Sequence, residues 1–91
     1  MSSVSTTFSA TGQSDALPVT KGPFTLSLSG FGTASVNLER KIDGSNWRVV
    51  ETFTEDSEMN GFEPSSAAEY RFNCTAFTSG PIAAFLETGE A

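Results

Sequence analysis

The sequence predicts an all-β fold, a single small antiparallel β-sandwich of jelly-roll or immunoglobulin-like type with about seven or eight strands. Three observations indicate this class. Apolar and polar residues alternate with period two through most of the chain, turn-forming residues separate the alternating runs at intervals of roughly a dozen residues, and no run has the length and periodicity of a helix. A chain of 91 residues allows one small domain. We therefore expect the sandwich at residues 15–91, preceded by a Ser- and Thr-rich arm at residues 1–14 that is either flexible or an edge strand.

Four runs carry the alternation, and each is expected to turn one set of side chains toward the core. Turn signals such as SGFG, DGSN, NGFEPSS and TSGP separate them. A last run, PIAAFLE, does not decide between the two faces. The expected inward residues are Phe24, Leu26 and Leu28; Val36, Leu38 and Ile42, with Arg40 as the exception in its series; Trp47, Val49 and Phe53; and Tyr70, Phe72, Cys74 and Ala76.

The segment IDGSNW holds a carboxylate, an amide and an aromatic ring close together. Asp-Gly between two alternating runs is among the strongest hairpin signals, because glycine adopts positive φ without steric cost. We therefore interpret Asp43, Gly44 and Asn46 as turn residues, with Trp47 opening the return strand. The expected cross-strand contacts of the tryptophan are Ile42 or Leu38. The alternative is a loop that binds a sugar.

The net charge of −6 argues against a nucleic-acid or anionic-membrane partner, because neutralising phosphates requires clustered Lys and Arg, and the five basic residues are scattered. Cys74 is the only cysteine, so no internal disulfide can form, which fits a reducing compartment. The sequence has no signal-peptide pattern, and no segment approaches the roughly 18 apolar residues of a membrane span. We therefore expect synthesis in the cytoplasm and no membrane partner.

The residue inventory argues against an enzyme. The sequence contains no histidine, so neither Cys74 nor any serine has its usual general base. Two carboxylates could supply acid–base chemistry, but no pair stands out. The acidic stretch ETFTEDSEMNGFE could hold calcium, although its spacing is not that of an EF-hand loop, and a solvated loop that blunts an edge strand explains it better. We predict no catalytic residue, no metal and no cofactor.

Aromatic residues outside the expected core are candidates for a partner surface. If Phe72 faces the core, Phe77 on the same strand falls on the opposite face, where Ile82, Ala84 and Leu86 could join it, and Phe31 and Phe62 lie in turns. Two alternatives remain open. The loops could fold back over the ends of the sandwich, or a bulge could reset the register of the strand.

The order of these features carries a resemblance. A Gly-rich turn opens SGFGTASVNLERKIDGSNWRVVETFTEDSE, which is followed by AAEYRFNCTAFTSGPIAAFLE, and together these segments lie within residues 22–87. The arrangement resembles small β-sandwich proteins encoded among bacteriophage structural genes, which sit on the virion as head decoration or related accessory proteins. No catalytic or ligand residue carries over, because the family pattern is structural.

The resemblance implies a non-enzymatic virion protein, made in the host cytoplasm, that binds the major capsid protein or another virion protein. It also implies a homo-oligomer, with a trimer favoured. The arm at residues 1–14 could order on binding or add a strand to a neighbouring edge. The alternative function is a glycan- or host-surface-binding module of a phage tail or fibre, with Trp47, Tyr70 or a loop phenylalanine as the platform.

Overall fold

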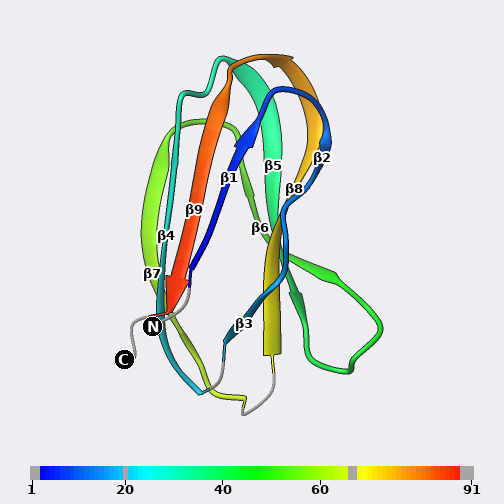
Figure 1. Ribbon diagram of the computed structural model, residues 1–91, viewed down its shortest axis with the longest axis vertical. Coiled ribbons are helices and arrows are strands. Elements are labelled where there is room, and N and C mark those ends of the chain that lie inside the picture. The colour runs from blue at the N-terminus through cyan, green and yellow to red at the C-terminus, as the bar shows by residue number, and fades with distance from the viewer. Residues whose placement is uncertain (1–2, 20, 66–67, 89–91) are drawn as a thin grey trace.

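The computed structural model describes residues 3–19, 21–65 and 68–88, and within these ranges the chain forms strands and turns without a helix (Figure 1). The alternation in the sequence accounts for this result, because side chains that point alternately to two faces allow one face to be buried. The strands are β1 (Ser3–Phe8), β2 (Gly12–Gln13), β3 (Leu17–Val19), β4 (Gly22–Ser29), β5 (Thr33–Lys41), β6 (Arg48–Phe53), β7 (Ser57–Glu63), β8 (Ala68–Ser79) and β9 (Ile82–Thr88).

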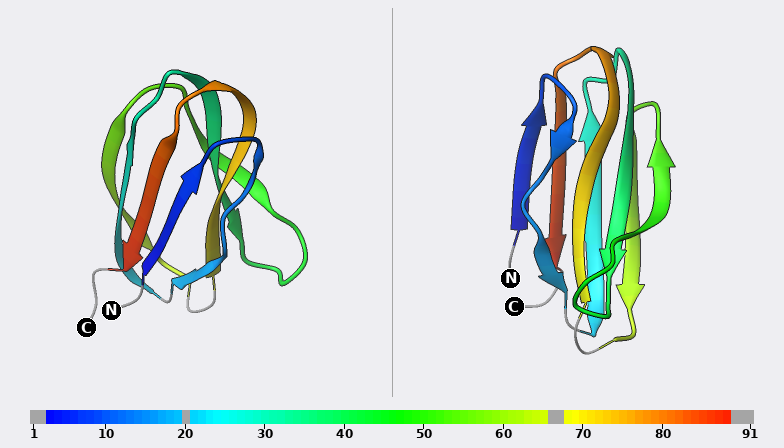
Figure 2. Two further views of the ribbon diagram at one scale, coloured as in Figure 1. Left: turned by 45° about the horizontal axis from the view of Figure 1, so that its top comes forward. Right: turned by 90° about the vertical axis from the view of Figure 1, so that its right-hand side faces the viewer.

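The strands form two sheets that pack face to face (Figure 2). Sheet A has the order β1-β9-β4-β7, and sheet B has the order β2-β8-β5-β6, with β3 also paired to β8. All of these pairings are antiparallel. The predicted antiparallel β-sandwich is therefore confirmed.

The strand order decides between the two sandwich types. β2 and β3 both pair with β8, so they act as one interrupted strand. The chain then forms four antiparallel pairs, β1–β9, β2/β3–β8, β4–β7 and β5–β6, which alternate between sheet A and sheet B. This is the arrangement of a jelly roll, a long antiparallel ribbon rolled into two sheets. The turn at residues 42–47 is the closed tip of that ribbon.

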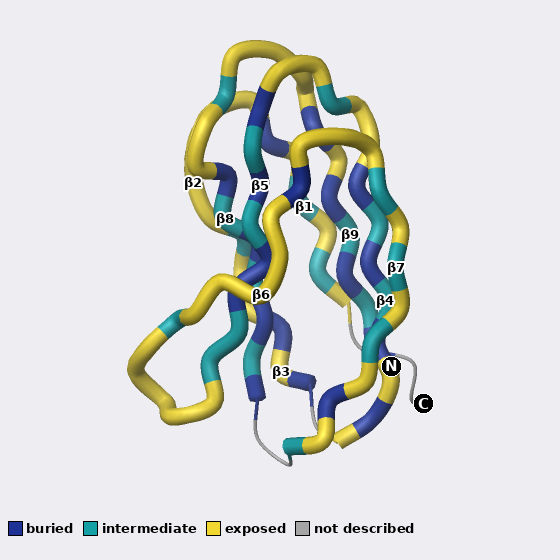
Figure 3. Tube along the Cα trace, turned by 180° about the vertical axis from the view of Figure 1, so that it is seen from behind, coloured by how far each residue is buried: buried dark blue, intermediate teal, exposed yellow. Residues whose placement is uncertain are grey.

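The core lies between the sheets, where the inward residues of both are buried (Figure 3). The Phe24 ring lies 4.7 Å from the Tyr70 ring, measured between centroids. Phe24 also packs directly on Gly61, where an added Cβ would collide with the ring. Each buried Leu or Phe side chain stabilises the fold by roughly 1.5–3 kcal/mol. The residues of the core with no exposed surface are Leu26, Val36, Leu38, Phe72, Ile82 and Leu86.

Four residues that were expected to face inward lie outside the core, and Ile42 and Ala76 are the first two. Ile42 is 53% exposed, because β5 ends at Lys41 and the turn begins there. Ala76 is exposed because the register of β8 shifts against β5, where Val36 lies opposite Cys74 but Ser35 lies opposite Ala76. The prediction failed at these positions because alternation cannot show where a strand ends or bulges.

The third run departs furthest from the expected pattern. Phe53 is buried opposite Val36, as its place in the alternation requires. A bulge then leaves Val50 without a partner in β5, and Val49 lies opposite Glu39 on the outer face. Val49 is therefore 55% exposed instead of buried.

The N-terminal residues are part of the sandwich. β1 pairs with β9 along its length, Phe8 is buried, and β2 and β3 belong to sheet B. Of the two alternatives for the arm, an edge strand describes β1, which is the first strand of sheet A.

Candidate functional site

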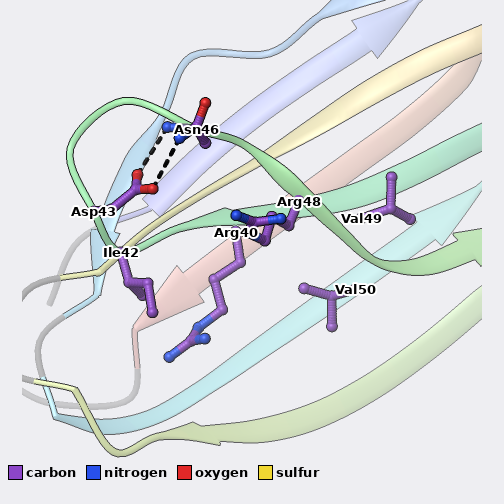
Figure 4. A pocket seen from close by; sticks show the side chains of 7 residues that line it. All are labelled: Arg40, Ile42, Asp43, Asn46, Arg48, Val49 and Val50. Atoms are coloured by element: carbon purple, nitrogen blue, oxygen red, sulfur yellow. Dashed lines mark hydrogen bonds between the residues drawn. The ribbon is translucent and has the colours of Figure 1, made fainter.

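The tip of the ribbon is held by hydrogen bonds to one carboxylate. Asp43 Oδ1 accepts from the backbone N–H groups of Ser45 at 2.9 Å and Asn46 at 2.8 Å, and Oδ2 accepts from Asn46 Nδ2 at 3.0 Å (Figure 4). These donors, the Asn46 N–H first, hold the pKa of Asp43 well below its usual range. Gly44 has a φ of 82°, the left-handed region that glycine adopts readily. The polar groups of the loop therefore bond to one another in a turn.

Trp47 lies outside the core, against the outer face of sheet B. Lys41 Nζ lies 4.8 Å and Arg71 Cζ 4.3 Å from the centroid of its ring. Cations at such distances are attracted by the negative face of an aromatic ring. The expected contact with Leu38 is wrong, because Leu38 is fully buried between the sheets and Trp47 does not pack against that core.

The outer face of sheet B carries charged side chains that pair across strands β5 and β8. Glu39 is buried, and its two oxygens accept from Arg71 Nε at 2.8 Å and Asn73 Nδ2 at 3.0 Å. Lys41 Nζ lies 3.1 Å from a carboxylate oxygen of Glu69. The charges of this face therefore satisfy one another.

A second charged cluster lies between the sheets and explains the exception at Arg40. Glu63 has no exposed surface and accepts from Arg40 Nε at 2.6 Å and Nη2 at 2.5 Å, from the Tyr70 hydroxyl at 2.6 Å and from the Ser65 N–H at 2.8 Å. The Arg40 hydrogen bonds lower the pKa of Glu63 to about 2. Burial, followed by the bond to Glu63, raises the pKa of Tyr70 to about 12. The cluster joins β5 and β8 of sheet B to the last residue of β7 in sheet A.

The outer face of sheet A has a different composition. In each strand of sheet A, outward residues alternate with residues that face the core. Small and uncharged side chains predominate among the outward residues, and no Lys or Arg occurs among the described residues of this face. Phe62 is 64% exposed and lies opposite Pro23, and Phe85 is half-buried between Ser5 and Ser27 on the neighbouring strands. The outward residues of sheet A are Ser3, Ser5, Thr7, Pro23, Thr25, Ser27, Ser29, Glu58, Asn60, Phe62, Ala83, Phe85 and Glu87.

The three phenylalanines expected on a partner surface lie in different surroundings. Phe62 points outward from β7. Phe31 and Phe77 are half-buried and pack against the core. The register shift in β8 brings Phe77 opposite Ala34, which is buried, so the alternative of a bulge describes this strand. Ile82, Ala84 and Leu86, which were expected to join Phe77, are buried in the core instead. Sequence reasoning missed Phe85, which faces outward between them in the undecided run PIAAFLE.

A shallow depression adjoins the tip of the ribbon at the edge of sheet B (Figure 4). It has a volume of about 230 Å³. Ile42, Val49 and Val50 contribute apolar surface and are 53%, 55% and 48% exposed. The complete lining is Arg40, Ile42, Asp43, Asn46, Arg48, Val49 and Val50.

The chain has one thiol, that of Cys74. Cys74 is buried, which raises the pKa of its thiol, and its Sγ donates to the Ala76 carbonyl at 3.5 Å. Within residues 3–19, 21–65 and 68–88, no three His, Cys, Asp or Glu side chains gather as metal ligands would. In the same part of the chain, no helix has the length and hydropathy needed to cross a bilayer.

Comparisons with family models, with curated proteins and with solved structures found no match to this chain. The arguments for its function therefore come from the fold, the surfaces of the two sheets and the resemblance described above.

Proposed function

We propose that this chain is a non-enzymatic structural protein of a bacteriophage virion, a capsid decoration or stabilising protein that binds the major capsid protein as a homo-oligomer. The observation that carries the proposal is the outer face of sheet A, which combines small uncharged side chains with an exposed Phe62. The absence of histidine and the engagement of both buried glutamates by arginine support a role without catalysis.

The composition of this face suits a protein–protein interface. The cores of such interfaces are depleted in charged residues and enriched in aromatic ones. The small side chains of Thr25 and Ser27 on β4 allow a flat partner surface to approach sheet A closely. Phe62 and Pro23, which lie opposite one another, form an apolar ridge beside them. A capsid presents the same partner surface many times, so modest binding by each copy of an oligomer adds up.

The jelly-roll strand order also supports the proposal. Jelly rolls are common in viral capsid proteins and in lectins. The first of these classes agrees with the resemblance to phage virion accessory proteins, and the second agrees with the alternative of a glycan-binding module. The fold alone does not separate the two classes, because one fold hosts many functions.

Trp47 separates the two functions better than the fold does. A glycan-binding platform needs an aromatic face that is free to stack on a sugar ring. Lys41 and Arg71 already lie over the Trp47 ring, and Asp43 and Asn46 bond to each other. This favours the decoration protein. Trp47 is the only tryptophan, so its fluorescence reports directly on sugar binding. A saturable change on titration with glycans would favour the alternative.

The test of the proposal places one arginine on each outer face. Ser27 on β4 and Asn37 on β5 are both half-buried polar residues near the middle of central strands. We expect Ser27→Arg to lower binding to purified particles of the encoding phage by about tenfold or more, because a bulky charge would be desolvated at the interface. The matched Asn37→Arg variant should bind as the parent does. Cosedimentation with particles measures both, and equal binding by all three proteins would overturn the proposal.

A further inference from the structure

The four edges of the two sheets differ in how well they are protected. A free edge strand can pair with another chain unless proline, charge, shortness or a bulge prevents it. β3 contains Pro18, β2 has two residues, and β7 contains Gly61 and the exposed Glu58. In β1, the apolar residues Val4 and Phe8 pack on the core. β6 also carries a bulge and the charges of Arg48 and Glu51, but it is the edge strand with two adjacent exposed valines.

β6 pairs only with β5 among the strands of the described residues, so its other side is free. Its sequence, RVVETF, contains neither proline nor glycine and is rich in residues that favour strands. Val49 and Val50 are about half exposed, at 55% and 48%. Figure 2 shows β6 on the outside of the sandwich.

The charges on β6 are complementary to those of a second β6 that runs antiparallel. When Val49 of one copy lies opposite Val50 of the other, Arg48 of each copy lies opposite Glu51 of its partner. The bulge at Val50 makes this geometry possible. Arg48 lies opposite Arg40 and Glu51 opposite Leu38, so both side chains point to the same face of sheet B. Arg48 and Glu51 form no ion pair with another described residue of their own chain.

We propose that β6 is the self-association edge, and that two copies pair antiparallel through it about a two-fold axis between Val49 and Val50. Sheet B of one copy then continues into sheet B of the second. The two strands contribute main-chain hydrogen bonds, a contact of four valines and two symmetric Arg48–Glu51 pairs. Since oligomers with a two-fold axis use the same patch on both subunits, the unit is a dimer and not the trimer that the resemblance implies.

The interface is small, so the dimer should depend on concentration. One strand pair buries less than the roughly 1,200 Å² of a stable interface. Sedimentation velocity from about 10 μM to 1 mM, a range suited to weak association, should show a monomer–dimer equilibrium. A single trimeric species, or a monomer throughout this range, would overturn the proposal.

Charge reversal tests the register directly. Arg48→Glu and Glu51→Arg each place like charges opposite one another twice, and each should raise the dissociation constant by about tenfold. The double variant Arg48→Glu/Glu51→Arg restores opposite charges and should recover the parent value. An equimolar mixture of the two single variants should form a mixed dimer with about the parent dissociation constant, although each variant alone pairs more weakly with itself.

The control variant is Glu58→Arg on β7, which makes the same change of charge at the edge of the other sheet. It should leave the dissociation constant within about twofold of the parent value, since distant exposed charges interact weakly. Dimerisation that neither single reversal weakens, or that the double variant and the mixture fail to restore, would overturn the proposed pairing. The result is independent of particle binding, which the Ser27→Arg variant tests on sheet A.

Discussion

Two ion pairs involve neighbouring residues of β5, Glu39 and Arg40, and lie on opposite faces of sheet B. Glu39 points outward and pairs with Arg71, whereas Arg40 points between the sheets and pairs with Glu63. The outer pair has one hydrogen bond between its partners and lies beside Trp47, with 21% of the Arg71 side chain and 9% of the Glu39 side chain exposed. The inner pair is bidentate, and its carboxylate has no exposed surface. Both pairs join an arginine to a glutamate, but Glu63 accepts four hydrogen bonds and Glu39 accepts two, so the pairs differ in hydrogen bonding as well as in the burial of the carboxylate.

The comparison shows how one strand can serve two purposes. A buried carboxylate without partners would cost several kcal/mol, so Glu63 requires all of its donors. Glu39 has two donors and keeps a small part of its side chain exposed, so removing its charge should cost less than removing that of Glu63. The inner cluster therefore helps to fix the position of sheet A on sheet B. The outer cluster joins strands within sheet B and does not contribute to the packing of the two sheets.

The largest expected effect comes from removing the inner carboxylate. Glu63→Gln leaves the guanidinium of Arg40 without a counter-charge between the sheets, and we expect a loss of about 3 kcal/mol in the free energy of unfolding. Urea denaturation followed by fluorescence measures this loss. A loss below about 1 kcal/mol would mean that Arg40, whose side chain is 28% exposed, reaches water easily.

Acid should remove the same contribution. The pKa of Glu63 is about 2 in the folded protein, against an ordinary value of 4.5. Because the folded value is the lower one, the stability that this carboxylate contributes is complete above pH 4.5 and is lost as the pH falls toward 2. Urea midpoints between pH 5 and pH 2 should fall in the parent and in Glu39→Gln, and fall less in Glu63→Gln. Parallel profiles for all three proteins would contradict this assignment.

A smaller effect is expected from Tyr70→Phe, which removes one donor from Glu63. The expected loss is about 1–2 kcal/mol near neutral pH. The pKa of Tyr70 is raised from 10 to about 12, so its contribution is present below pH 10 and is lost as the pH rises to 12. Tyr70 is the only tyrosine, so tyrosinate absorbance titrates it directly. A midpoint near 10 in the folded protein would show that the hydroxyl is not held as described.

The smallest expected effect is that of the outer pair. Glu39→Gln keeps a hydrogen-bond acceptor beside Arg71 and Asn73, and Arg71 can turn to solvent. We expect a loss of about 1 kcal/mol or less, reduced further by salt. Urea denaturation at low and high salt measures it. A loss equal to that of Glu63→Gln would show that the deeper burial and additional donors of Glu63 do not make the inner pair the stronger one.

Much of the fold could be predicted from the sequence, because alternation reports which faces of a strand are buried. The buried sets in β4 and the first part of β8 follow the pattern, from Phe24 to Leu28 and from Tyr70 to Cys74. Two bulges, at Ser35/Val36 and at Leu38/Glu39, reversed the pattern beyond them. A bulge has no signature in alternation until the partner strand is known.

The candidate sites were less predictable, because they depend on contacts between distant residues. Arg40 was marked as an exception, but its partner Glu63 lies on the other sheet, 23 residues along the chain. The outer face of sheet A exists only because β1, β9, β4 and β7 lie side by side. This strand order places the first strand, β1, beside the last, β9, and no pattern within a short segment of the sequence indicates it.

The ribbon topology sets a time order for folding. β5 and β6 flank a short turn and can pair as soon as both are made, whereas Ser3 in β1 must wait for Glu87, roughly 80 residues later. At a synthesis rate of about 5–20 residues per second, that delay lasts roughly 4–16 seconds. The chain therefore folds from its middle outward. A pause in translation just after β6 would leave β1, β2, β3 and β4 without their partners while the tip hairpin can already form.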